Sequence, residues 1–216
     1  MSWDPLARRF REIGVPVRFA DRGWFSVDVD RSGRRERIRL SPGDAQLHVM
    51  DSDRDRRQLL LQARRGPDWA GRRQAPLKLL VGQDERQLFS VTVPSWRRVV
   101  NTVAAAHEAL KPDAVRAAGR KAVRQGEWFF VPFPWIGERY GIRRRVRLGW
   151  RNPHVIDQVL GNPSDLFGGR PRNSWSSGAV YARGFVRHRE HRPLHLRCWH
   201  RIYLNTAGVV SGGSVD

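Results

Sequence analysis

Four histidines lie within residues 188–200, and three of them, with a nearby carboxylate, could form one site. His188 and His191 flank Glu190 just before Pro193, and His200 follows on the next expected strand. Imidazole nitrogens are common ligands of zinc and other divalent ions, and an imidazole can act as a general base near neutral pH. The pattern predicts either a metal site formed by His188, His191 and His200, or partly protonated histidines on a basic surface that contact phosphate; we favour the second interpretation.

Arginine dominates the charged residues around these histidines. The chain has 40 Lys and Arg against 21 Asp and Glu, and lysine occurs only at positions 78, 111 and 121. The formal net charge is +19, and residues 111–216 carry 19 basic and 7 acidic residues. A guanidinium binds phosphate through two N–H groups and stacks on bases, so a nucleic acid is the leading partner. A GC-rich genome would explain the preference for Arg over Lys, but not the shortage of acids.

Two expected strands place these arginines beside aromatic residues. In residues 142–150 a period of two puts alternate arginines on one face, and residues 194–204 alternate in the same way. Such a face can hold phosphates and stack unpaired bases, and the alternative is an ordinary polar sheet face. The expected nucleic-acid-binding residues are Arg143, Arg145, Arg147, Arg151, Arg187, His195, Arg197, Trp199, Arg201 and Tyr203.

The elements that must position these residues are mostly strands. Short strand-like runs recur at roughly ten-residue spacing with Gly, Pro and Asp turns between them. Helices are expected over residues 4–13, 95–110 and 113–118. The fold class is therefore expected to be α+β, predominantly antiparallel β with a few helices. Residues 119–126 mark a boundary between an N-terminal module, 1–118, and a basic, β-rich C-terminal module, 119–216, with a loose tail over 206–216.

Several other classes of protein find no support in the sequence. There is no apolar run of about 18 residues, no nucleotide-binding glycine loop and no serine nucleophile elbow. The acidic segment at residues 51–55 fails as a calcium loop, since Arg56 stands where Gly is required and Gln62 where Glu is required. Cys198 is the only cysteine, which excludes an internal disulfide and fits a reducing compartment. We expect a cytoplasmic protein with no membrane partner.

Three segments of the second half carry a resemblance to other sequences. RQGEWFF at 124–130, RGFVRH at 183–188 and WHR at 199–201 resemble segments of uncharacterised bacterial and phage-type proteins. The resemblance implies no fold, activity or cofactor, and it favours a mobile-element context.

These observations lead to one expected function and two alternatives. The expected function is nucleic-acid binding, with RNA or single-stranded DNA favoured, alone or with protein partners in a larger nucleoprotein complex. We expect a binding protein rather than an enzyme, and no cofactor. The first alternative is a metal-dependent nuclease that uses zinc or another divalent ion at His188, His191 and His200. The second is a basic structural protein that docks an acidic protein partner.

Overall fold

The computed structural model groups the chain into two compact units. It describes residues 3–20, 24–33, 35–41, 43–67, 71–72, 74–85, 87–94, 99–136, 141–149, 153–167 and 178–206. The first unit comprises the described part of residues 1–110 together with Thr206, and the second comprises that of residues 111–205. The helix at 113–118, which the sequence analysis assigned to the N-terminal module, groups with the second unit. Within the described residues, no helix has the length and apolar character needed to cross a bilayer.

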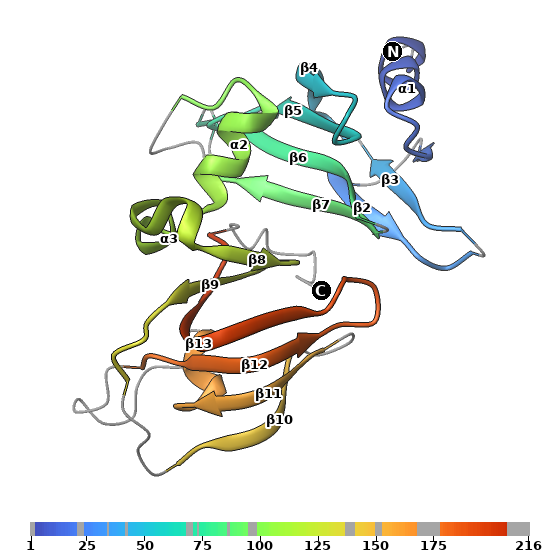
Figure 1. Ribbon diagram of the computed structural model, residues 1–216. Coiled ribbons are helices and arrows are strands. Elements are labelled where there is room, and N and C mark those ends of the chain that lie inside the picture. The colour runs from blue at the N-terminus through green and yellow to red at the C-terminus, as the bar shows by residue number, and fades with distance from the viewer. Residues whose placement is uncertain are drawn as a thin grey trace. The chain divides into compact units, whose positions relative to one another are not determined.

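The first unit contains two sheets and two helices (Figure 1). A three-stranded sheet has the order β1-β3-β2, with β1 parallel to β3 and β2 antiparallel to it. A four-stranded antiparallel meander follows in the order β4-β5-β6-β7. The elements are α1 (Asp4–Glu12), β1 (Val17–Phe19), β2 (Ser26–Asp30), β3 (Arg37–Ser41), β4 (Gln46–Asp53), β5 (Gln58–Arg64), β6 (Leu77–Asp84), β7 (Gln87–Val93) and α2 (Val103–Leu110).

Strand β5 is buried on both of its faces, which explains its continuous apolar run. Leu59 and Leu61 join a core with Phe10 of α1 and Ile38 of β3. Leu60, which points the other way, joins a second core that includes Leu80 of β6 together with Val103 and Ala106 of α2. A strand covered on both faces needs no polar alternation, because neither side meets water.

Helix α2 begins later than the sequence indicated. A start at Ser95 was expected, but residues 99–102 are not helical, and residues 95–98 lie outside the described residues. Thr102 provides the cap, since its Oγ1 accepts a hydrogen bond from the Ala105 amide at 3.1 Å. The Asp51 carboxylate accepts another from the Val103 amide at 2.7 Å, and a negative charge at a helix start is stabilising.

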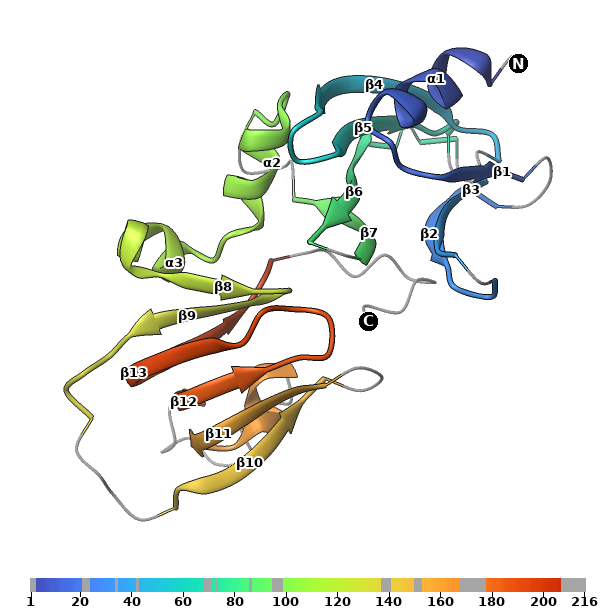
Figure 2. The ribbon, with the colours of Figure 1, turned by 45° about the vertical axis from the view of Figure 1, so that its right-hand side comes forward.

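The second unit is built on one antiparallel sheet of six strands in the order β10-β11-β12-β13-β9-β8 (Figures 1 and 2). One face carries the apolar core, which includes Trp128, Phe130, Ile156, Val186 and Leu196. Its elements are α3 (Asp113–Ala118), the 3-10 helices η1 (Gly119–Lys121) and η2 (Pro163–Phe167), β8 (Val123–Gln125), β9 (Trp128–Pro132), β10 (Arg143–Leu148), β11 (His154–Leu160), β12 (Tyr181–Arg187) and β13 (Leu194–Leu204).

The expected fold class is confirmed by this architecture, since antiparallel strands dominate both units and the helices are short. The charged segment at residues 51–55 lies at the end of β4 and in the turn to β5. There the Asp53 carboxylate accepts hydrogen bonds from the backbone and side-chain nitrogens of Arg56, at 2.9 and 2.7 Å. The segment is therefore a charged turn that is stabilised internally.

We expect Gly82→Ala to destabilise the first unit by about 2–4 kcal/mol. Gly82 has a φ of 152°, and an added Cβ would lie far inside van der Waals contact with the Arg57 carbonyl and 2.8 Å from Gln58 Cα, both of them backbone atoms of the β4–β5 turn and β5. Urea unfolding measures the effect. Gly33→Ala is the control because its added Cβ finds ordinary contact distances of 3.5 Å or more. Equal stabilities for the two variants would contradict the prediction.

Candidate functional site

Three histidines meet at one end of the six-stranded sheet. His154 is the first residue of β11, whereas His188 and His191 lie in the turn between β12 and β13. In Figure 1 this turn, the start of β11 and the β8–β9 turn lie at the same end of the sheet. One ligand nitrogen from each imidazole lies within 4.8 Å of those of the other two. We name these three residues the histidine cluster.

His154 stacks on the imidazole rings of both His188 and His191, whereas the rings of His188 and His191 are tilted by 30° to each other. The ring centroids of His154 and His188 are 4.3 Å apart, and those of His188 and His191 are 4.6 Å apart. His154 and His191 are 5.8 Å apart with nearly parallel planes. The Glu190 amide donates a hydrogen bond to His188 Nδ1 at 3.2 Å, so this nitrogen accepts rather than carries a proton. The stacking holds three basic groups within a small volume.

His154 is the buried member of the histidine cluster. Only 2% of its surface is exposed, and neither ring nitrogen has a hydrogen-bond partner among the described residues. Burial, reinforced by the two neighbouring histidines, lowers the pKa of His154 to about 3, so the ring is neutral at pH 7. A buried polar group without a partner costs about 1–3 kcal/mol, which makes His154 an unusual core residue.

The β8–β9 turn closes over the histidine cluster. Gly126 has a φ of 60°, and Glu127 does not adopt a positive φ, which fits a two-residue type II′ hairpin turn with glycine first. A Cβ at Gly126 would lie 3.1 Å from His191 Nε2 and 3.3 Å from His154 Nε2. Glycine is therefore required twice here, by the backbone conformation and by the closeness of the imidazoles.

Gln125 fixes the turn that carries His188 and His191. Its buried side-chain amide donates hydrogen bonds to the backbone carbonyl of Arg192 at 2.5 Å and to that of Val186 at 3.4 Å. These acceptors lie on either side of the two histidines. A single side chain of β8 thereby ties down both ends of the β12–β13 turn.

Glu127, the second residue of the β8–β9 turn, places a carboxyl group near His191. Burial raises the pKa of Glu127. Hydrogen bonds with its own backbone amide and with Trp128 oppose this rise most, and the charges of His191 and Arg124 oppose it less. The carboxylate therefore lies close enough to the histidine cluster for the charges to interact. Sequence reasoning did not single out Glu127 for this position, because its place depends on how the β8–β9 hairpin lies against the β12–β13 turn.

His200 does not join the group that the sequence suggested. It lies within β13, is buried, and its Nδ1 is 2.8 Å from the Cys198 carbonyl. The expected set of His188, His191 and His200 is therefore wrong in its third member, and His154 takes that place. No sequence signal marks His154, since the rest of β11, η2 and β12 all lie between it and His188 in the chain.

The face of the sheet opposite the apolar core carries arginines paired with aromatic rings. Directly opposed residues in antiparallel strands share a face, and alternate residues along a strand share one too. The registers put Arg124, Phe129 and Tyr203 on this face, and likewise Tyr181 and Arg201. We name it the arginine–aromatic face. Its guanidinium–ring pairs are Arg124 with Phe129 at 5.9 Å, Arg183 with Trp199 at 4.9 Å, Arg187 with Phe185 at 4.7 Å and Arg201 with Tyr203 at 5.2 Å.

Phe185 is the exposed centre of this face. It is 39% exposed, its ring stacks on His195 with centroids 4.5 Å apart, and the Arg187 guanidinium lies against it. Arg147 of β10 extends the same face. It lies opposite Val155 of β11, and Val155 in turn lies opposite Arg187 of β12, so all three share one face. Sequence analysis identified Arg147, Arg187 and His195 but missed Phe185, although its alternation with Arg183 and Arg187 on β12 would have revealed it.

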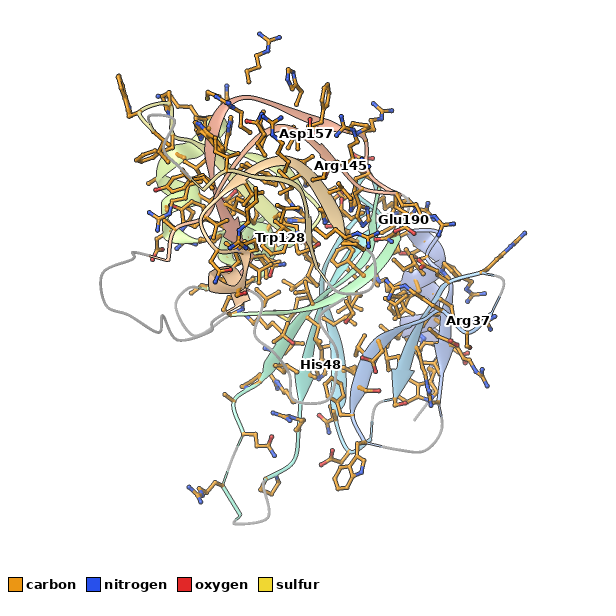
Figure 3. The ribbon with its side chains drawn as sticks, turned by 90° about the horizontal axis from the view of Figure 1, so that it is seen from below. Arg37, His48, Trp128, Arg145, Asp157 and Glu190 are labelled. Carbon is orange, nitrogen blue, oxygen red and sulfur yellow. The ribbon has the colours of Figure 1, made fainter. Side chains whose placement is uncertain are left out.

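Asp157 orients Arg187 beside Phe185. Its carboxylate accepts a hydrogen bond from the Phe185 amide at 2.9 Å and another from the Arg187 guanidinium. These bonds, and the charge of Arg145, lower the pKa of Asp157. Asp157 and Arg145 are labelled near each other in Figure 3. Gly184 makes the arrangement possible, since it has a φ of 87° and an added Cβ would lie 2.8 Å from that of Asp157.

Other residues expected to bind nucleic acid have different surroundings. Trp199 is only 3% exposed and lies under Arg183, so it cannot stack on a base, and its predicted role is wrong. Tyr203 and Arg201 are half-buried against each other. Arg197 is exposed, whereas Arg151 lies outside the described residues.

The expected row of arginines along β10 is interrupted. Arg145 has a φ of 52° and is left out of the β10–β11 pairing, while Arg144 and Val146 on either side stay in register. Arg143 lies opposite Val159, which is buried in the core, so it does not continue the face of Arg147. Strict alternation fails because Arg145 adopts the left-handed conformation, and the pairing of the neighbouring strands β11 and β12 shifts register between Ile156 and Gln158.

Comparisons with protein-family models, with curated proteins and with solved structures found no match.

We expect Gly126→Ala to destabilise the second unit more than Gly119→Ala does. Gly119 has a φ of 55° and a ψ of −130°, close to the first position of a type II′ turn, but an added Cβ there meets open space. Both variants suffer the backbone strain, and only Gly126→Ala also displaces imidazoles, at a further cost of roughly 1 kcal/mol. Urea unfolding measures the difference, and ring signals of His154 and His191 in NMR spectra should shift in Gly126→Ala alone. Equal losses would show that the turn does not press on the histidine cluster.

Proposed function

We propose that the second unit binds single-stranded nucleic acid through its arginine–aromatic face. The observation that carries this proposal is the exposed stack of His195, Phe185 and Arg187, with Arg147 beside it on the same face. A flat stack of aromatic and guanidinium groups offers surfaces on which unpaired bases stack, and arginines next to it supply phosphate contacts.

The charge of the second unit supports an anionic ligand. Residues 111–205 contain 19 basic and 6 acidic residues. Arg144, Arg147, Arg187 and Arg197 are all exposed on the six-stranded sheet. A surplus of this size attracts polyanions and speeds their association at low ionic strength.

A single strand fits this face better than a duplex does. Reading a duplex in its major groove commonly uses an α-helix, and α3, the one α-helix described in the second unit, has only six residues. A sheet with exposed stacking groups is instead the arrangement that binds splayed bases, with little dependence on sequence. RNA and single-stranded DNA share this chemistry, and the binding assay distinguishes them.

We expect Phe185→Ala to weaken binding roughly 5- to 100-fold, because the variant loses the stacking of one base on the Phe185 ring. Fluorescence anisotropy with labelled oligouridine and oligothymidine of about 12 nucleotides, within the site sizes of single-strand binders, measures the affinity. Trp24→Ala is the matched control, because Trp24 is 94% exposed but belongs to the first unit. If Phe185→Ala binds as tightly as the wild type, the stack is not the site. If the wild type fails to bind any single strand at low salt, the proposal is wrong and an acidic protein partner becomes the better hypothesis.

We expect Arg147→Gln to act differently from Phe185→Ala. Removing one phosphate contact should reduce the slope of log affinity against log salt concentration by about 0.7, whereas loss of a stacked base should leave the slope unchanged. Arg120→Gln is the control, since Arg120 is an exposed arginine of η1 away from the sheet strands. An unchanged slope for Arg147→Gln, or an equal change for Arg120→Gln, would remove Arg147 from the interface.

A further inference from the structure

We propose that His154, His188 and His191 together bind one divalent transition-metal ion of the zinc class. The proposal is independent of nucleic-acid binding, since none of the three residues belongs to the exposed stack around Phe185. It rests on the convergence of three imidazoles from two separate segments of the chain, and on the unsatisfied state of the buried one.

The donor set selects the kind of ion. Three imidazole nitrogens suit zinc, copper, nickel or iron, whereas calcium and magnesium prefer oxygen ligands. At a tetrahedral zinc with Zn–N distances of about 2.0–2.1 Å, the nitrogens lie about 3.3 Å apart. The ligand atoms here lie within 4.8 Å of one another, so rotation of the side chains brings them to bonding distance. His188 and His191 lie in a turn and are only half-buried.

The second observation is the state of His154. Both of its ring nitrogens are buried without a hydrogen-bond partner among the described residues, and metal coordination would satisfy one of them. Because His154 is only 2% exposed, it cannot offer its ring to a phosphate at the surface, so the interpretation favoured from the sequence fits this cluster less well.

Metal binding requires a small change at His188. Its Nδ1 accepts a hydrogen bond from the Glu190 amide. A metal at Nδ1 would take the place of that amide, and a metal at Nε2 would require a proton on Nδ1, which also ends the bond. Either way the backbone of the β12–β13 turn at Glu190 responds to the metal, and its amide signal reports binding.

Glu127 acts as a positioning residue in this proposal. A carboxylate near a ligating imidazole orients the ring and raises its basicity. Glu127 directly follows Gly126, whose added Cβ would lie 3.1 Å from His191 Nε2, so the β8–β9 turn gives Glu127 that role. Three protein ligands leave a fourth position for water, which is the arrangement of catalytic rather than structural zinc sites. The nuclease alternative would therefore use His154 in place of His200.

The experiment is a titration of the full chain, purified without a histidine tag and stripped with chelator, with Co²⁺ and then Zn²⁺. The expected result is one bound ion per chain by elemental analysis, with the intense visible absorption of tetrahedral Co²⁺. Zn²⁺ at about 100 times its Kd should raise the melting temperature by about 10 °C. His188→Gln and His191→Gln should each weaken binding at least about 100-fold, and Glu127→Gln about 10-fold with unchanged stoichiometry.

His195→Gln is the matched control, because His195 is exposed on the sheet face and lies outside the histidine cluster. A readout that needs no variant accompanies the titration: Zn²⁺ should shift the ring NMR signals of the three histidines and the Glu190 amide, and leave His195 unchanged. Absence of stoichiometric binding by folded wild-type protein overturns the proposal, and so does binding that survives in folded His188→Gln and His191→Gln. Neither outcome bears on the affinity for oligonucleotides.

Discussion

The second unit depends on the side chain of Gln125. Because its amide donates to backbone carbonyls on both sides of the β12–β13 turn, the short strand β8 becomes the clamp for a turn 61 to 67 residues further along the chain. The same hairpin brings Gly126 against the imidazoles and Glu127 beside His191. Without the clamp, His188 and His191 would sit on an untethered turn and their approach to His154 would not be fixed.

The arginine–aromatic face shows how many like charges are accommodated on one sheet. Four neighbouring arginines repel one another when nothing compensates them, and such repulsion would favour a bound anion. In the structure the guanidinium groups of Arg124, Arg183, Arg187 and Arg201 lie against rings, and Arg187 also pairs with Asp157. Cation–π contacts and this ion pair stabilise the charges locally. The argument for an anionic ligand therefore shifts from repulsion to the exposed geometry around Phe185.

Much of the fold could be predicted from the sequence, because alternating strands and turn residues are local signals. The fold class and most strands follow from them, and α1 follows from Pro5 and its apolar positions. The site was harder to predict. The left-handed conformation of Arg145 interrupts strict alternation along β10, so a residue assigned to one face by counting, such as Arg143, lies on the other.

Trp199 illustrates a further limit of periodicity, which assigns a face but cannot say whether other side chains cover it. His154 illustrates another, since the approach of distant segments depends on the strand order β10-β11-β12-β13, which no local pattern encodes. His188 and His191 were found because they are close to each other in the sequence. Their partner His154 was missed because it is far from them in the sequence.

The double burial of β5 has a consequence for how the first unit comes apart. Leu59 and Leu61 serve one apolar cluster and Leu60 serves the other, so the two clusters share a single backbone segment. Loss of packing in one cluster would disturb β5 and therefore the other cluster as well. A partly unfolded form in which only one cluster has lost its packing is therefore disfavoured. The two layers therefore form one cooperative unit, and the amides of β5 should open only with the whole of it.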